Sequence, residues 1–175
     1  MQDHLGESMG QGDENDRLQA AWDELNLVLS FFSRVDTRIS AVLAINLAML
    51  AVAGARWPGL DEMSWRMVAA AALFAVPWIW GVYALWRAIF PDRDGGTNSL
   101  VFFQSIAKLN ESTFISSFMN RSKLELAEDV LEQAWRNARI LSRKYDSLCT
   151  ACRAQIFAVA PWFWLLIELP AKGSN

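Results

Sequence analysis

The sequence predicts an all-α integral membrane protein, with two to three transmembrane helices and a cytoplasmic helical extension. Apolar residues make up 53% of the 175 residues and charged residues 20%, whereas soluble domains have about 45–50% and about 25%. Three runs of the chain carry no charge, and elsewhere apolar residues recur at the helical spacing of three and four. No stretch shows the strict alternation of apolar and polar residues that is typical of a strand.

The first helix is predicted from an apolar stripe that follows an acidic head. Residues 1–15 contain three Gly, several acids and few apolar side chains, so we expect them to be disordered. From Asp16 onward apolar residues recur every three or four positions and continue, without Pro or Gly, into the uncharged run 39–55. This pattern predicts one continuous helix over about 17–53, ended by the Trp-Pro-Gly sequence at 57–59.

Two further runs are candidates for membrane spans. Residues 67–86 are 20 uncharged positions inside a predicted helix over 63–90, and at ~1.5 Å per residue they reach about 30 Å, the thickness of a hydrocarbon core. The third run has 14 uncharged residues before Glu168, and we extend it over about 154–169 as a span with interfacial Trp side chains. A buried or surface-lying helix is the alternative for this third run.

The segment between the second and third spans, about 87–153, is also predicted to be helical. It should contain a loop, two short helices and the start of a long helix, over 91–96, Ser99–Asn110, Ser112–Asn120 and from Ser122 onward. Ser122 is a suitable N-cap, with Glu125 three residues later as in a capping box. Together, residues 16–170 form a single unit, followed by a tail over 171–175.

Lysine and arginine positions predict the orientation. Thirteen of these 16 residues precede the first span or lie between the second and third spans, and three lie elsewhere. The positive-inside rule then places the amino terminus and the segment 87–153 in the cytoplasm. The cytoplasmic parts of the two long helices carry apolar stripes that need a partner, so we expect a homo-oligomer in the lipid bilayer.

Several function classes are disfavoured by the composition. A net charge of −3 argues against nucleic-acid binding through bulk charge. Two Cys and one His are too few for a structural zinc site, and Cys149 and Cys152 lie within a predicted helix, where they are better explained as small packing residues than as a redox pair. No phosphate-binding Gly loop or carboxylate–His pair is present. We therefore expect no enzyme activity, no metal and no cofactor.

Polar residues gather at the predicted membrane entrance. Asp36 and Arg38 lie just before the first span, and Arg143 and Lys144 lie two to three turns before the third. One interpretation is that these charges are solvated or pair with one another. The other is an anion-binding site, built from Arg and Lys with a carboxylate nearby.

Four strings of residues, taken in order, resemble the transmembrane effector family of Pycsar, the bacterial anti-phage system built around a pyrimidine cyclase. They are Phe32…Asp36-Thr37-Arg38…Leu43…Asn46, then Ile89-Phe90-Pro91, then Leu100-Val101-Phe102-Phe103-Gln104-Ser105-Ile106, and Ile140-Leu141-Ser142-Arg143-Lys144-Tyr145. The resemblance covers about Asp23 to Leu169. The family often has Lys where this chain has Arg38, a change that keeps the charge but alters hydrogen-bond geometry.

The resemblance implies a function and a ligand. A cognate cyclase makes a cyclic pyrimidine mononucleotide, cUMP or cCMP, during infection; the effector binds it and impairs the inner membrane, which causes abortive infection. For such a ligand we expect cations, a hydrogen-bonding carboxylate and an aromatic wall. The candidate residues are Asp36, Arg38, Phe102, Phe103, Arg143, Lys144 and Tyr145. The alternative is a non-enzymatic membrane adaptor or scaffold whose cytoplasmic helices dock a partner protein.

Overall fold

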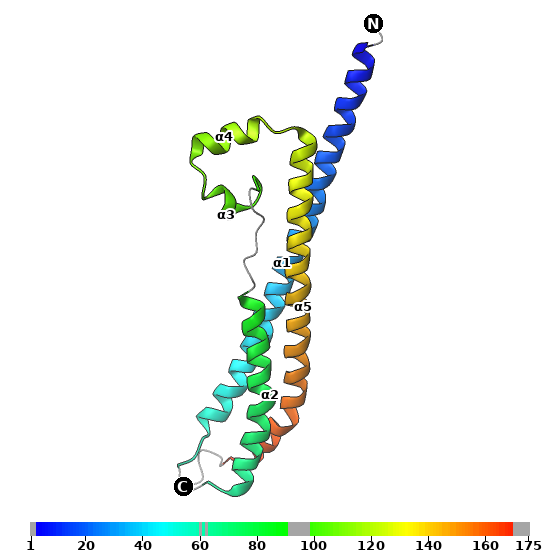
Figure 1. Cartoon of the computed structure of the whole chain (residues 1–175). Coiled ribbons are helices and arrows are strands. Elements are labelled where there is room, and N and C mark those ends of the chain that lie inside the picture. Colours follow the sequence, from blue (N-terminus) through cyan, green and yellow to red (C-terminus); the bar gives the residue numbers. More distant parts are fainter. Residues whose placement is uncertain (1–2, 60, 62, 91–98, 170–175) are drawn as a thin grey trace. The chain divides into compact units, whose positions relative to one another are not determined.

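The protein is built from α-helices. The computed structural model describes residues 3–59, 61, 63–90 and 99–169, and no strand occurs within these ranges (Figure 1). The helices are α1 (Asp3–Ala55), α2 (Trp65–Ile89), α3 (Phe103–Ile106), α4 (Glu111–Met119) and α5 (Lys123–Glu168). Among the described residues, three helices, namely α1, α2 and α5, are long and apolar enough to cross a membrane. The predicted all-α class is confirmed.

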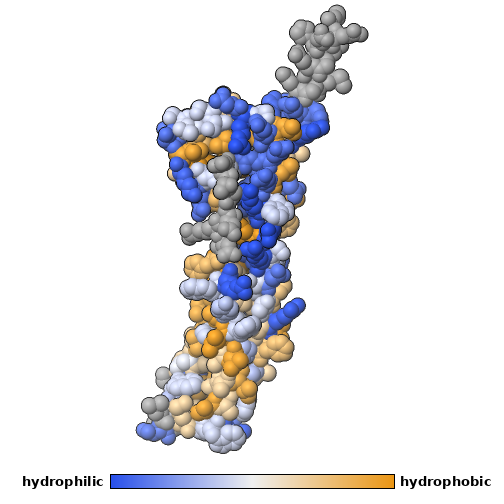
Figure 2. All heavy atoms as spheres, in the orientation of Figure 1, coloured by the Kyte–Doolittle hydropathy of each residue, from blue (hydrophilic) through white to orange (hydrophobic). Residues whose placement is uncertain are grey.

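The helices form two compact units. Unit 1 comprises Met1–Ser33 and Asp92–Leu141, and unit 2 comprises Arg34–Pro91 and Ser142–Asn175. The first halves of α1 and α5 belong to unit 1 together with α3 and α4, and their second halves belong to unit 2 together with α2. All three predicted spans therefore lie in unit 2, whose surface carries many apolar side chains (orange in Figure 2).

Unit 2 is a bundle of three helices around an apolar core. The core contains Met49, Ala53, Met67, Ala70, Phe74, Ala158, Leu165 and Leu169. Two tryptophans hydrogen-bond to the backbone of α1: the indole N–H of Trp78 donates to the Asn46 carbonyl oxygen (3.1 Å), and that of Trp162 donates to the Met49 carbonyl oxygen (2.9 Å). A buried indole N–H needs such a partner, so these bonds fix α2 and α5 against α1.

Helices α2 and α5 pack closely at Gly81. A Cβ atom placed on Gly81 would lie 3.3 Å from the Ala154 Cβ and 3.6 Å from the Ala151 carbonyl oxygen. Small residues at such a crossing let two backbones pack closely, which is how membrane helices associate where water provides no driving force. The contact also sets the register between α2 and α5.

Polar contacts hold the end of unit 2 that contains the turn between α1 and α2. The Arg66 guanidinium pairs with the Glu168 carboxylate at 3.1 Å, and the Trp164 indole N–H donates to the same carboxylate oxygen. Arg56 donates to the Leu169 carbonyl oxygen (3.1 Å). Because the last carbonyls of a helix have no intrahelical donor, this bond satisfies one of them and ties the end of α5 to the end of α1.

The second and third spans each contain a proline inside a helix. Helix α2 continues through Pro77 and α5 continues through Pro161 as far as Glu168. Proline removes one backbone donor from the helix, but neighbouring helices and side chains in a bundle can satisfy the carbonyl that loses its partner. The third apolar run is thus part of one uninterrupted helix.

Unit 1 packs the first half of α1 against the first half of α5. Its core consists of Ala21, Leu25, Ala127, Val130 and Ala134, with Leu18, Trp22 and Val101 packed against it. The turn before α3 is held to α5 by the buried Asp129, whose carboxylate accepts a hydrogen bond from the Leu100 N–H (2.7 Å) and lies 3.6 Å from the Arg121 guanidinium.

The structure differs from the sequence prediction in two places within unit 1: residues 99–110 and the start of α1. The predicted helix Ser99–Asn110 is reduced to the four residues of α3, because the Ser99 hydroxyl oxygen accepts hydrogen bonds from the Val101 and Phe102 N–H groups and forms a turn instead. Helix α1 starts at Asp3, within the head that we expected to be disordered. An Arg17–Asp13 ion pair one turn apart (2.7 Å) favours helix in that region. The predicted loop 91–96 and tail 171–175 lie outside the described residues.

The start of α5 confirms the predicted capping box. The Ser122 hydroxyl oxygen accepts a hydrogen bond from the Glu125 N–H (3.2 Å), and the Glu125 carboxylate accepts one from the Ser122 N–H (2.8 Å). The backbone N–H and the hydroxyl of Ser122 both lower the pKa of Glu125. A lowered pKa means that the cap stabilises the helix above the usual pKa of a glutamate and is lost as the pH falls through the lowered value.

The Gly81 contact predicts a difference between two helical glycines. Gly81→Leu should destabilise unit 2 by about 1–3 kcal/mol, because the side chain has to displace Ala154 or the α5 backbone. Gly54→Leu is the control, since a Cβ atom at Gly54 meets nothing within 4 Å. Thermal unfolding of both variants in the same detergent measures the effect. Equal losses of stability at the two positions would contradict close packing at Gly81.

Candidate functional site

The centre of the predicted membrane entrance is an ion pair between α1 and α5. The Lys144 ammonium donates a hydrogen bond to the Asp36 carboxylate at 2.6 Å. The Lys144 side chain is 10% exposed and the Asp36 side chain 53%. Lys144 lies on the same face of α5 as the buried Leu148 and Ala151, so its side chain packs in the bundle and its ammonium pairs there with the more exposed Asp36 carboxylate.

Three other predicted site residues of unit 2 are close neighbours of this pair in the sequence: Arg38, Arg143 and Tyr145. Arg38 is exposed and makes no hydrogen bond or ion pair with any described residue. Arg143 is exposed and has a polar or electrostatic partner, and Tyr145 is half-buried. The geometry brings Asp36 and Lys144 into direct contact and leaves the Arg38 guanidinium available to an anion.

The two predicted phenylalanines belong to unit 1. Their ring centroids are 5.0 Å apart, with the planes tilted by 59°. Phe102 is half-buried at the N-cap of α3, and Phe103 is 69% exposed in its first turn. An exposed ring beside a half-buried one offers a surface on which a flat base can stack.

A buried polar row on α5 was not anticipated from the sequence. Asp129 and Gln133 are both buried and lie one turn apart, and Arg136 follows one turn later. The Gln133 Oε1 and Arg136 Nη1 atoms are buried and have no hydrogen-bond partner among the described residues. The signal for this row is its spacing: polar residues at 129, 133 and 136 recur at helical spacing beside the apolar stripe of the same helix.

The structure gives no evidence of a redox or metal site within the residues it describes. Cys149 is exposed, Cys152 is half-buried, and both are free thiols. No group of three or more His, Cys, Asp or Glu side chains in the described part of the chain is placed to hold a metal ion. Both cysteines lie within α5, but the exposed Cys149 is not packed against the described chain in the way that the packing interpretation predicts for it.

The Asp36–Lys144 contact predicts an asymmetric mutational effect. Asp36→Asn should destabilise the fold by about 1–3 kcal/mol, since it leaves a largely buried ammonium without its carboxylate. Adding Lys144→Met should recover part of that loss, because the charge that needs a partner is removed. Asp146→Asn is the control, as that exposed carboxylate has no partner among the described residues. Thermal unfolding of the wild type, Asp36→Asn, Lys144→Met and the double variant gives the coupling energy, and strictly additive losses would contradict the pair.

Comparison with known proteins gives one match. The family model described as Pycsar effector protein domain, PycTM, matches residues 20–169. Neither the curated proteins nor the solved structures gave a match. The matched range contains α2, α3, α4 and α5 completely, as well as the part of α1 that packs in both units. Since it covers most of the chain, this protein belongs to the Pycsar effector family of anti-phage defence proteins with transmembrane helices.

Proposed function

We propose that this protein binds a cyclic pyrimidine mononucleotide, cUMP or cCMP, made by a cognate cyclase, and then impairs the inner membrane. The infected cell stops growing before phage are released. The family match supports the defence role, and the observation that carries the mechanism is the continuity of α1 and α5. Each helix contributes one half to the polar unit 1 and the other half to the apolar unit 2.

Such helices provide a physical route from ligand to membrane. A ligand shifts a conformational equilibrium only by its difference in affinity for the two states. If the bound state requires α1 and α5 to change their pairing, the same change is imposed on the membrane helices, because neither helix is interrupted between the units. The output is then mechanical, and the proposal assigns no catalytic residue, metal or cofactor.

The proposed ligand site is centred on the unit 2 residues of the membrane entrance. Arg38 supplies a charged donor for the phosphate, and Arg143 and Lys144 add positive charge nearby. Asp36 offers an acceptor for the ribose hydroxyl, while Tyr145 offers an aromatic wall. The exposed position of Arg38 and the buried amine of Lys144 support this division of roles. Phe102 and Phe103 remain predicted stacking residues.

Direct binding tests this site. Titration of the full-length protein in detergent with the four cyclic mononucleotides of uridine, cytidine, adenosine and guanosine should show saturable binding of a pyrimidine ligand. Arg38→Ala should weaken it at least tenfold, because a charge-assisted contact to the phosphate is worth about 1.5–3 kcal/mol. Arg87→Ala, at the end of α2, is the control and should bind normally. Unchanged binding by a folded Arg38→Ala, Lys144→Ala protein would reject this location.

The proposed assembly is a homo-oligomer with its amino terminus in the cytoplasm. Leu124, Leu131 and Trp135 share one face of α5 in unit 1, and each is more than two-fifths exposed. Ala138 continues this exposed face. An apolar stripe of this kind is typical of a helix that packs against another chain. The inner-membrane orientation rests on the distribution of Lys and Arg.

The stripe predicts a specific loss of assembly. Leu131→Glu combined with Ala138→Glu should convert the oligomer to monomers, because carboxylates cannot be buried in an apolar interface without partners. Lys123→Glu, at the exposed first residue of the same helix, should leave the assembly unchanged. Mass photometry or light scattering in detergent measures the result. A wild-type protein that is monomeric with and without nucleotide would contradict the proposal.

The same stripe favours one alternative function. A non-enzymatic membrane adaptor would use an exposed apolar helix face to dock a partner protein rather than a second copy. The two functions differ in their ligand. An adaptor has no need of the unpaired Arg38 and would bind none of the four cyclic mononucleotides, whereas the effector binds a pyrimidine one.

A further inference from the structure

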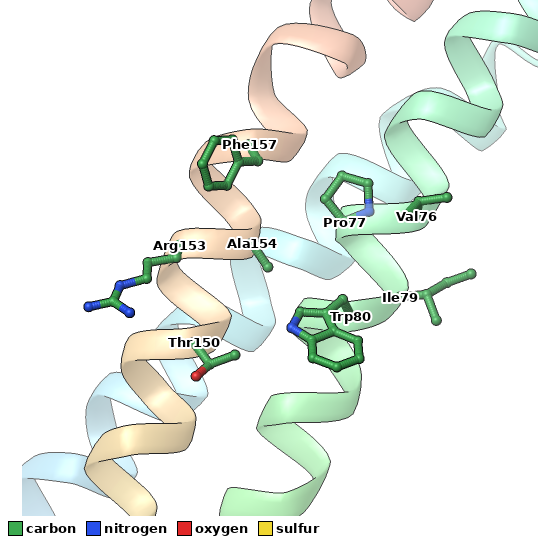
Figure 3. Close-up of a pocket in the computed structure, with 8 residues that line it drawn as sticks. All are labelled: Val76, Pro77, Ile79, Trp80, Thr150, Arg153, Ala154 and Phe157. Carbon is green, nitrogen blue, oxygen red and sulfur yellow. The ribbon is translucent and has the colours of Figure 1, made fainter.

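Helices α2 and α5 border a groove on the surface of unit 2. Its volume is about 480 Å³, within the range of about 300–1,000 Å³ that is usual for small-molecule sites. The lining residues are Val76, Pro77, Ile79 and Trp80 of α2, with Thr150, Arg153, Ala154 and Phe157 of α5 (Figure 3). All but Thr150 and Arg153 present hydrocarbon or an aromatic ring, so the groove is apolar with one cation at its edge.

The cation at this edge, Arg153, lies just inside the end of the uncharged run of α2 that Arg87 marks. Arg153 precedes Ala154, which packs against Gly81, and Gly81 is six residues from Arg87, the charged residue that ends the uncharged run of α2. At 1.5 Å per residue, Arg153 is about 9 Å inside that boundary. It is exposed and makes no ion pair or hydrogen bond with the described chain. An ionised side chain at this depth needs an anion or water.

The protein itself offers no carboxylate at this depth among its described residues. Within unit 2, Asp36 is paired with Lys144, and Glu168 is paired with Arg66 near the opposite end of α5. Asp61 lies in the turn between α1 and α2. Asp146 precedes Arg153 by seven residues, about 10 Å along α5. A second copy inserted in the same direction would present these groups at the same depths, so it would not supply the missing anion either.

We propose that the α2–α5 groove binds an anionic phospholipid. One acyl chain lies against Pro77, Trp80 and Phe157, and the phosphate pairs with Arg153. Helix side chains lean toward the amino-terminal end of their helix, and the Arg153 guanidinium in Figure 3 is displaced toward the Thr150 end of α5. That end leads to the charged half of α5, so the side chain extends toward the boundary where lipid phosphates lie.

This inference does not depend on the proposed ligand or signal. It requires only that unit 2 lies in a bilayer and that an acidic headgroup is available to Arg153. The groove would then bind anionic lipids in preference to neutral ones at one position on the bundle. This preference should weaken at high ionic strength, because salt screens the pairing of Arg153 with the phosphate.

The test measures which lipid stays with the purified protein. The full-length protein is extracted in detergent and exchanged into micelles containing equal amounts of phosphatidylglycerol and phosphatidylcholine, and native mass spectrometry counts the lipids retained. The wild type should retain phosphatidylglycerol about fivefold over phosphatidylcholine, the value expected for one cation near the membrane surface. Arg153→Gln should abolish the preference and Arg153→Lys should keep most of it.

Two further variants distinguish lipid binding in the groove from a general attraction of anionic lipid to positive charge. Arg87→Gln, a cation of unit 2 that does not line the groove, should keep the wild-type preference. Val76→Trp fills the groove from an exposed position and should reduce the retained lipid with Arg153 still present. Val76→Trp also tests the proposed lipid binding if Arg153→Gln fails to fold. The proposal is overturned by equal retention of both lipids in the wild type or by an equal loss in Arg87→Gln and Arg153→Gln. An Arg153→Gln protein that becomes monomeric with unchanged lipid would overturn it too, since a second copy would then cover the groove.

Discussion

The constraint on which the structure depends is that backbone polar groups inside hydrocarbon must be satisfied within the protein. A helix does this along its whole length, which is why the apolar runs extend as uninterrupted helices. Helices α1 and α5 are 53 and 46 residues long and continue from the apolar unit into the polar one. Polar groups that a helix cannot satisfy bond to neighbouring helices instead. The Trp78 and Trp162 indoles donate to α1 carbonyls, and Arg56 donates to the carbonyl of Leu169, the residue that follows α5.

This continuity has a consequence for function. The same two helices build the core of unit 1 and two of the three helices of unit 2, and the proposed mechanism requires that a change in their pairing in one unit is passed along them to the other. The Asp36–Lys144 contact lies where α1 and α5 enter unit 2, and it joins these two helices directly. An ion pair with one half-exposed partner is weaker than a buried one, and a ligand with its own charges can compete for it. This position is therefore suited to couple binding to the bundle.

The sequence predicts the elements that depend on local pattern. The end of α1, the extent of α2 and the capping box at Ser122 follow from uncharged runs, turn residues and the spacing of Ser and Glu. It does not predict the turn at residues 99–102, because the local bonds to the Ser99 hydroxyl are combined with a bond from the Leu100 N–H to Asp129, 29 residues later in the chain. The start of α1 before Asp16 differs for another reason: few apolar residues recur there, but the Arg17–Asp13 pair one turn apart favours helix where the head joins the apolar stripe.

In the candidate site, too, the sequence identifies the residues, whereas their contacts depend on how the helices pack. Residue types and their approximate depth identify Asp36 and Lys144, but their pairing depends on which faces of α1 and α5 meet. The groove at Arg153 depends on the contact of Gly81 with Ala154, two residues that carry no chemical signal of their own.

The central claim, that nucleotide binding opens or disrupts the membrane, is tested most directly by leakage from vesicles. The purified protein is reconstituted into liposomes loaded with a self-quenched dye, and each cyclic mononucleotide is added in turn. The account predicts rapid dye release with a cyclic pyrimidine nucleotide and none with the purine ones or without ligand. Release that does not depend on nucleotide, or intact vesicles although the pyrimidine ligand is bound, would contradict it.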